Sequence, residues 1–368
     1  MDFSFTDDQE SVAKLARQLF EHHATPERLT EVESGEVRYD PALWSELASS
    51  DLLGISLPEA FGGSGGSFLD LAILLAEVGR SVAPVPVYST LALGADTIAR
   101  QGDTDIQQQY LPEVVAGRAI LTAALTEPGN SAPDTPRSTT ARRDGDAWRI
   151  DGVKDLVPAG QLADAIIVSA LADDGPGLFI VEPDAATVEV TPAATTHGEP
   201  HADLCFAGAA GRRLGSGDPG LVTSLYTRAL VAMSAVQIGV CERALRLAAT
   251  YTSQREQFGR PIGSFQAVQQ RMADAFIDTE AIRWTTWHAA WLIAEGRPAG
   301  REAAIAKFWA AEAGARVLAT AQQVHGGMGI DVTYPLSRYF LWAKHIELAL
   351  GSASQQLARL GNAYLEGH

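Results

Sequence analysis

Apolar and polar residues in the first third of the chain recur with the period of an α-helix. Thr6 is followed three positions later by Gln9, a spacing typical of the capping box that begins a helix. Apolar residues then repeat at helical spacing up to Phe20, and the same period returns over residues 69–82 and 91–100. Pro and Gly separate these stretches. The pattern predicts an N-terminal domain of helices.

The middle of the chain changes to short runs rich in Val, Ile and Thr. Turn signals stand between them, at Asp144–Asp146 and at Asp151-Gly152. Three runs have the composition of strands, namely residues 165–169, 177–181 and 187–191. We predict a small antiparallel β domain.

From Gly220 onward the pattern is helical to the end of the chain. The runs contain few breakers apart from those at Arg260-Pro261 and between Gly326 and Pro335, and we interpret them as four long amphipathic helices in sequence. Such helices form a bundle, and wide apolar faces of this kind often continue into a subunit interface. The predicted fold is α+β and mainly α, with a helical domain over 1–118, a β domain over 119–213 and a four-helix bundle over 214–368.

Composition excludes several classes of function. The formal net charge is −17, and nucleic acid or anionic lipid would need an excess of Lys and Arg. Cys205 and Cys241 are the only cysteines, which fits a reducing compartment. The N-terminal stretch is acidic rather than apolar, and no apolar run approaches the length of a membrane span. We expect a soluble cytoplasmic protein.

Two local motifs suggest chemistry that their context does not support. Gly62–Gly66 matches the G-x-S-x-G nucleophile elbow, but Leu57-Pro58-Glu59 before it does not form a buried strand, so we expect a loop. A second cluster could ligate a metal, but Pro200 prevents a regular helix there and no further cluster completes the set. We expect no metal and a polar turn at this cluster, formed by His197, His201, Asp203 and Cys205.

Two further segments have the residue types of a nucleotide-binding surface. In the segment 255–266, Arg255 stands close to a predicted helix end near Phe258-Gly259, where its guanidinium could fork onto a pyrophosphate. In the segment 323–329, Gly326 and Gly327 would let the backbone approach a ligand. Taken separately, each segment also fits an ordinary helix terminus.

Together these segments resemble the acyl-CoA dehydrogenase family, and the resemblance covers nearly the whole chain. The segments that carry it are Phe5–Gln9, Leu57–Gly63, Ala124–Gly129, Arg255-x-Gln257-Phe258-Gly259, Gln323-x-x-Gly326-Gly327-x-Gly329, and Tyr334-Pro335 with Arg338. The family removes two hydrogens from the α and β carbons of acyl-CoA thioesters. A carboxylate takes the α proton and FAD accepts the hydride. The resemblance therefore implies FAD as cofactor.

The catalytic glutamate of the family is missing at both of its usual positions. Leu350 occupies the commoner position and Thr227 the alternative one, before Arg228. Glu347, one helical turn before Leu350, is a weaker candidate for a relocated base. No residue of this chain is therefore assigned as catalytic.

The residues that contact FAD in this family are retained on one side only. In the β domain, Leu156-Val157-Pro158 and Asn130–Ala132 replace the segments that hold the flavin ring, and Pro158 also lacks a backbone N–H. The contribution to a neighbouring subunit's FAD is intact. The resemblance assigns cofactor binding to Arg255, Gln257, Phe258, Gln266, Gln323, Gly326 and Gly327.

This one-sided retention resembles the non-catalytic subunits of actinobacterial α2β2 acyl-CoA dehydrogenases, several of which act on steroid side-chain CoA thioesters. The implied function is a place in fatty acid or steroid β-oxidation beside a homologous catalytic chain. That chain would hold the acyl-CoA and pass electrons to an external acceptor. Two alternatives stay open: a self-sufficient homo-oligomer with a relocated base, and a flavin-free acyl-CoA-binding or scaffold protein.

Overall fold

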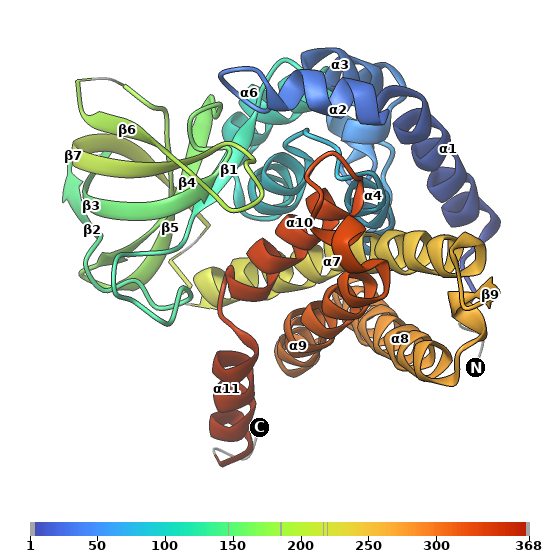
Figure 1. The fold of residues 1–368 in the computed structure, drawn as a ribbon. Helices are drawn as coiled ribbons and strands as arrows, with labels where there is room; N and C mark the ends of the chain where they lie inside the picture. The colour runs from blue at the N-terminus through green and yellow to red at the C-terminus, as the bar shows by residue number, and fades with distance from the viewer. Residues whose placement is uncertain (1–3, 146, 185, 216, 219, 366–368) are drawn as a thin grey trace. The chain divides into compact units, whose positions relative to one another are not determined.

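The computed structural model describes residues 4–365 except 146, 185, 216 and 219 (Figure 1). Asp146, in one of the predicted turns, therefore lies outside the described residues. The chain divides into two compact units. The helical unit comprises Met1–Pro26, Ala72–Ala83 and Leu230–His368, and the barrel unit comprises Glu27–Leu71 and Pro84–Ala229. The domain boundaries expected near residues 118 and 213 stay a prediction.

The helical unit begins with the predicted capping box. The backbone N–H of Gln9 donates to Thr6 Oγ1 at 3.2 Å, and the N–H of Thr6 donates to Gln9 Oε1 at 3.1 Å. The remaining helices of the unit form a bundle in which α9 packs against three others. Its helices are α1 (Asp7–His23), most of α4 (Phe68–Ser81), most of α7 (Gly220–Gln254), α8 (Gln266–Ala294), α9 (Gly300–His325), α10 (Leu336–Leu348) and α11 (Ala353–Leu365).

Helix lengths in the bundle differ from the sequence pattern. α7, α8 and α9 have 35, 29 and 26 residues, whereas α10 and α11 have 13 each. The fourth predicted helix is divided by a turn at Leu350-Gly351, where both residues have a positive φ. Helix α11 packs against α9, and Figure 1 shows its C-terminal end extending beyond the other helices of the bundle.

Helix α7 is the one described helix that is long and apolar enough to cross a membrane by length and composition. Of that apolar stretch, 78% is buried inside the protein. Buried residues such as Ala235, Ile238 and Val240 explain the composition, because a core helix is apolar on most of its faces.

The barrel unit contains short helices around a seven-stranded sheet. Asp40 caps one helix by accepting hydrogen bonds from the N–H groups of Ala42 and Leu43. Residues Tyr88–Ala95 form a buried π-helix, η3, which the sequence pattern did not distinguish from an α-helix. The α-helices are α2 (Pro26–Glu33), α3 (Pro41–Ser49), α5 (Asp96–Gln101) and α6 (Thr104–Val115), and the 3-10 turns are η1 (Leu52–Gly54) and η2 (Glu59–Phe61). The Gly62–Gly66 segment is a loop, as predicted.

The strands close into a barrel. The sheet order is β1-β4-β2-β3-β7-β5, with β5 pairing back to β4 and β6 added to β7. Most pairs are antiparallel, as predicted, but β1 runs parallel to β4 and β2 meets β4 in parallel at one residue pair. The strands are β1 (Leu121–Ala124), β2 (Thr140–Asp144), β3 (Ala147–Pro158), β4 (Ala165–Ala172), β5 (Gly175–Val181), β6 (Val188–Ala193) and β7 (His201–Leu214).

Candidate functional site

A short hairpin at the end of α7 presents the first predicted segment. α7 ends at Gln254, earlier than the predicted end near Phe258-Gly259, because β8 (Glu256–Gln257) pairs with β9 (Arg260–Pro261). The two loop residues, Phe258 and Gly259, have φ of 54° and 75°. Positive φ at both positions is the requirement of a type I′ turn, which favours Asn and Gly.

Phe258 has an energetically unfavourable backbone conformation in this turn. A bulky side chain is rare at positive φ, and the Phe258 side chain is also 94% exposed. Arg255 and Gln257, on the same hairpin, are exposed too. Arg255 forms no ion pair with any other residue that the structure describes. The hairpin therefore offers an aromatic face and a cation to something outside this chain.

The second segment follows the end of α9. Gln323 is exposed in the last turn, and Gly326 has φ 58° and ψ −133°, a conformation open only to glycine. A Cβ atom added to Gly326 or Gly327 would meet nothing within 4 Å. The backbone here is open to a ligand. Gln266, the remaining predicted contact, is exposed as the first residue of α8.

A ring contact brings the two segments together. Tyr251, one turn before Arg255, stacks on His325, directly before Gly326, with ring centroids 4.4 Å apart. The exposed residues of the two segments therefore lie at neighbouring ends of α7 and α9. We call the surface formed by segments 255–259 and 323–327 the lending surface.

The turn at Leu350 is rigidly held although it carries no base. Leu350 has φ 55°, and its backbone oxygen accepts from Gln356 Nε2 at 3.1 Å. Lys307, fully buried, donates to the backbone oxygens of Ile346 at 2.8 Å and Gly351 at 3.0 Å. Burial lowers the pKa of Lys307 to about 7. The aliphatic side chain of Leu350 cannot accept a proton.

The other two candidate positions for a base are also engaged or unsuitable. Glu347 Oε2 lies 2.5 Å from Lys344 Nζ in an ion pair on α10. In the barrel unit, Thr227 donates its hydroxyl hydrogen to the backbone oxygen of Thr223 at 2.8 Å. Its neighbour Arg228 is buried in a bidentate ion pair with Asp96, at 2.5 and 2.6 Å.

Leu156-Val157-Pro158, which replaces the flavin-holding segment of the family, is hydrogen-bonded to other strands of the barrel unit. Leu156 and Ala159 have positive φ, on either side of Pro158, and the β3–β7 register shifts between Lys154 and Val157. The N–H of Leu156 donates to Asp203 Oδ1 at 2.9 Å. Thr122 donates its hydroxyl hydrogen to the backbone oxygen of Pro158 at 2.5 Å. These polar groups are used inside the chain.

The loop at Asn130 is likewise internally bonded. Its side chain donates to the backbone oxygen of Thr135 at 2.8 Å and accepts from the N–H of Ala132 at 3.0 Å. Just before this loop lies a buried pair that sequence reasoning missed, in which Lys154 Nζ is 3.1 Å from Glu127 Oε1. In the sequence, the only feature that singles out Glu127 is its place in the segment Ala124–Gly129, one of those that carry the family resemblance.

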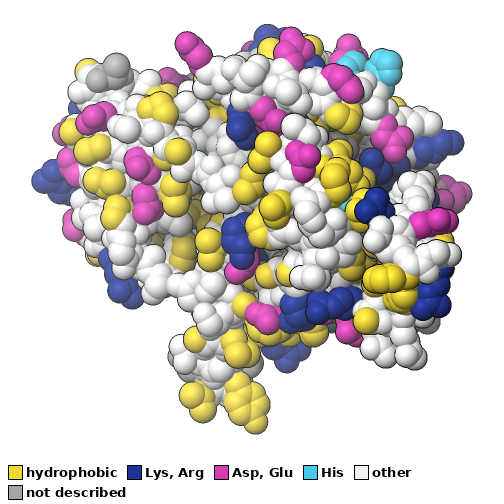
Figure 2. All heavy atoms as spheres, viewed as in Figure 1, with side chains coloured by type: hydrophobic (Ala, Val, Ile, Leu, Met, Phe, Trp, Pro, Cys, Tyr) yellow, Lys and Arg dark blue, Asp and Glu magenta, His cyan; other side chains and the backbone are white. Residues whose placement is uncertain are grey.

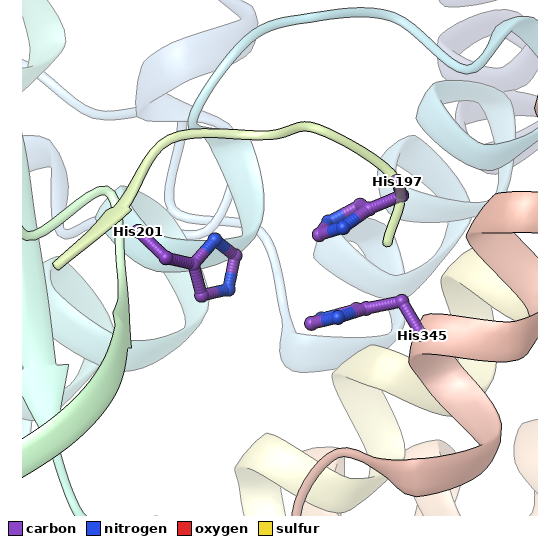
Figure 3. Close-up of side chains that lie close together, drawn as sticks. All are labelled: His197, His201 and His345. Carbon is purple, nitrogen blue, oxygen red and sulfur yellow. The ribbon is translucent and has the colours of Figure 1, made fainter. Parts of the chain in front are cut away.

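His197 and His201, of the predicted polar turn, are both buried in the barrel unit. The rings of His197 and His201 lie edge to face with centroids 5.4 Å apart (Figure 3). His201 Nδ1 lies 3.1 Å from the backbone oxygen of Glu199. Asp203 is engaged with Leu156, as described above, and Cys205 lies on the exposed face of β7. The predicted polar turn is observed only at His197, because His201 begins strand β7 and Asp203 and Cys205 continue it.

The helical unit also leaves large apolar side chains uncovered. Figure 2 shows hydrophobic side chains gathered over the free end of α11. Further exposed apolar residues lie on α8 (Phe276, Ile277, Trp284 and Trp291), between α9 and α10 (Met328, Ile330 and Val332), on α10 (Leu341 and Leu348) and on α11 (Leu357, Tyr364 and Leu365). Exposed apolar residues in such number are typical of an interaction surface.

Comparison with known families identifies the class of this protein. Models of the acyl-CoA dehydrogenase N-terminal, middle and C-terminal domains match residues 6–118, 122–208 and 223–365. The chain belongs to the acyl-CoA dehydrogenase family of FAD-dependent oxidoreductases.

Individual relatives match the chain from end to end. The acyl-CoA dehydrogenase FadE27 of Mycobacterium tuberculosis is 39% identical, over 100% of this chain and 99% of its own length. The solved Tcur3481-Tcur3483 steroid ACAD is 44% identical with a TM-score of 0.94, covering 98% of both chains. The ChsE4-ChsE5 complex from Mycobacterium tuberculosis is 39% identical with a TM-score of 0.94, covering 100% of this chain and 99% of that chain.

Proposed function

We propose that this chain is the non-catalytic subunit of a heterotetrameric acyl-CoA dehydrogenase and lends half of an FAD site to a homologous catalytic chain. The observation that carries the proposal is Phe258, which is held almost fully exposed at a positive φ near Arg255, a cation with no ion pair among the described residues. Within the chain the Phe258 ring makes an edge contact with Phe265, at a centroid distance of 6.2 Å, yet stays almost fully exposed. A second chain that brings a cofactor against the lending surface gains a ring contact and a cation.

Each residue of the lending surface has a role that its chemistry supports. The guanidinium of Arg255 would bind the FAD pyrophosphate, and the ring of Phe258 would contact the flavin or ribityl part. Gln323 and the open backbone at Gly326 and Gly327 would bind the adenosine and phosphate part of FAD. Gln257, on the hairpin, and Gln266, at the start of α8, would contribute further polar contacts. When bound, FAD supplies the hydride acceptor for α,β-dehydrogenation of an acyl-CoA.

The partner would supply what this chain lacks. Leu350 and Thr227 stand where the family carries its glutamate, and the Leu156–Pro158 segment is hydrogen-bonded to other strands of the barrel unit. The catalytic glutamate, the flavin pocket and the acyl-CoA cleft would therefore belong to the homologous chain. Exposed apolar side chains on α8, α10 and α11 support an α2β2 assembly.

The substrate class follows from the relatives rather than from the site. The two solved relatives, Tcur3481-Tcur3483 and ChsE4-ChsE5, are named as pairs of chains, and the first is called a steroid ACAD. We infer a CoA thioester of a steroid side chain, with a fatty acyl-CoA as the simpler alternative. An external electron acceptor and a cytoplasmic location complete the proposal.

The two alternatives have less support. A self-sufficient enzyme would need Glu347 as its base, but that carboxylate is ion-paired with Lys344. A flavin-free scaffold would have no use for Arg255, Phe258 and the open glycines together on one surface.

The test is flavin binding by the chain alone and by the chain co-expressed with the family member encoded beside it. We expect FAD and dehydrogenase activity only in the pair, with one FAD for every two chains. Arg255→Ala should reduce the FAD content of the pair, while the control Arg301→Ala, an exposed arginine paired with Glu302, should not. A lone chain that binds flavin and turns over acyl-CoA, with loss of turnover in Glu347→Gln, would overturn the proposal.

A further inference from the structure

A buried histidine joins the two segments of the lending surface. His325 is 2% exposed and directly precedes Gly326. Its Nδ1 atom lies 2.7 Å from the backbone oxygen of Ala321, and its Nε2 atom lies 3.1 Å from the hydroxyl oxygen of Tyr334. Its ring stacks on Tyr251 and makes a tilted contact with Tyr334, at a centroid distance of 5.1 Å.

These contacts fix one tautomer of the imidazole. A backbone oxygen can only accept, so the proton of the neutral ring must be on Nδ1 and is donated to Ala321. Nε2 then accepts the hydroxyl hydrogen of Tyr334. Burial lowers the pKa of His325, which favours this neutral form. Both ring nitrogens have a defined partner, and the ring can therefore occupy only one orientation.

The three rings come from three separate segments. Tyr251 is in the last turn of α7, and its backbone oxygen accepts from the N–H of Arg255 at 2.8 Å. His325 ends α9. Tyr334 follows the 3-10 turn η5 (Gly326–Ile330), which contains both open glycines. A movement of the His325 ring would shift Gly326 relative to Arg255.

Resting on the proposed function, we propose that His325 is a positioning residue that holds Gly326 and Gly327 in register with Arg255 on the lending surface. An apolar side chain would fill the same space without the free-energy cost of removing two polar nitrogens from water. The imidazole adds orientation, because its hydrogen bonds to Ala321 and Tyr334 define the angle at which the chain leaves α9. His325 itself need not touch the cofactor.

The experiment titrates FAD into the deflavinated pair carrying substitutions in this chain. His325→Phe keeps a ring in the stack but removes both hydrogen bonds, and should weaken FAD binding by about tenfold. Tyr334→Phe removes one hydroxyl and should weaken binding by about threefold. The control His22→Phe changes an exposed histidine on α1 that also contacts an aromatic ring, that of His23, and should leave binding unchanged.

A double-mutant cycle separates positioning from general stability. If His325 acts through the geometry of the lending surface, its effect on FAD affinity shrinks when Arg255→Ala is already present. A merely structural role would give additive effects and a lowered melting temperature of the flavin-free chain. If His325→Phe does not fold, Tyr334→Phe supplies the same cycle.

The possible failures are distinguishable. A wild-type pair that binds no FAD, or that binds it equally well with Arg255→Ala, overturns the proposed function and this inference with it. A wild-type pair that binds FAD and depends on Arg255, yet binds equally well or additively with His325→Phe and Tyr334→Phe, overturns only the inference. Non-additive losses in both variants establish it.

Discussion

The ammonium nitrogen of Lys154 lies 3.1 Å from a carboxylate oxygen of Glu127 inside the barrel unit, where neither side chain is more than 1% exposed. Lys154 also donates to Ser169 Oγ at 3.0 Å. Glu127 accepts from the N–H groups of Arg137, Ser138 and Thr139 and so fastens the loop that follows it. This buried pair ties β3 to the loop that contains Asn130.

Replacing Lys154 with Met should strongly destabilise the chain. The substitution leaves the carboxylate of Glu127 buried without its counter-charge, which costs about 3 to 5 kcal/mol. Urea denaturation followed by circular dichroism measures the free energy of unfolding. The matched control is Arg142→Met, which breaks the exposed ion pair with Asp151 and should cost less than about 1 kcal/mol. Equal effects at the two sites would contradict the prediction.

The same pair predicts an acid-side loss of stability. Burial raises the pKa of Glu127, but the N–H of Ser138, the ammonium of Lys154 and the N–H of Thr139 outweigh it and lower the pKa to about 2. A pKa depressed in the folded state contributes stability above the unfolded value, about 4.3, that is lost as the pH falls through about 2. The free energy of unfolding of wild type should therefore fall more steeply than that of Glu127→Gln between these values. Parallel curves would refute this.

The crossing of α4 and α7 predicts a position that tolerates no side chain. A Cβ atom on Gly239 would overlap the backbone oxygen of Ala76 and the backbone nitrogen of Arg80. Gly239→Ala should separate the two helices and lower the free energy of unfolding by about 3 kcal/mol. Gly361→Ala, in α11 with nothing within 4 Å, should instead stabilise the chain by about 0.5 to 1 kcal/mol. Thermal unfolding of both variants distinguishes these outcomes.

At Phe258 we expect one substitution to raise the stability of the chain and to lower FAD binding by the pair. Asn suits the positive φ of the type I′ turn, so Phe258→Asn should stabilise the isolated chain by about 1 kcal/mol. The same variant should reduce FAD retention by the pair, because the ring is lost. Phe258→Ala should reduce FAD retention equally without the gain in stability, since Ala does not relieve the backbone. A variant that loses stability and keeps its FAD would show that the ring serves the hairpin itself.

The sequence allowed the fold to be predicted where local pattern decides it. The capping box at Thr6 and the strands over 165–169 and 177–181 are observed, because helix caps and short β-branched runs depend on near neighbours. Barrel closure through the parallel contact of β2 with β4 depends on residues Thr140 and Leu171, far apart in sequence. The local hydrophobic pattern of a sequence does not indicate which distant strands pair.

The site was predicted less completely. Motif spacing identified Arg255 and Gly326, but it missed that a hairpin, and not the helix end, presents Phe258. Two buried lysines were also missed, Lys154 in the barrel unit and Lys307 in the helical unit. A lysine in a sequence is expected at the surface. Lys154 and Lys307 are buried because Glu127 and the backbone oxygen of Ile346, respectively, bind their ammonium groups in the folded chain. The roles assigned to the lending surface stay predictions until FAD binding is measured.

The exposed hairpin also bears on how the cell must handle this protein. An aromatic ring displayed at the tip of a hairpin, next to uncovered apolar helices, is what chaperones and proteases recognise in an incomplete assembly. Under the proposed function, a surplus of this chain over its partner would therefore aggregate or be degraded, and a surplus of the partner would lack half of its cofactor site. Balanced synthesis of the two chains, more than the abundance of either, would set the amount of working enzyme.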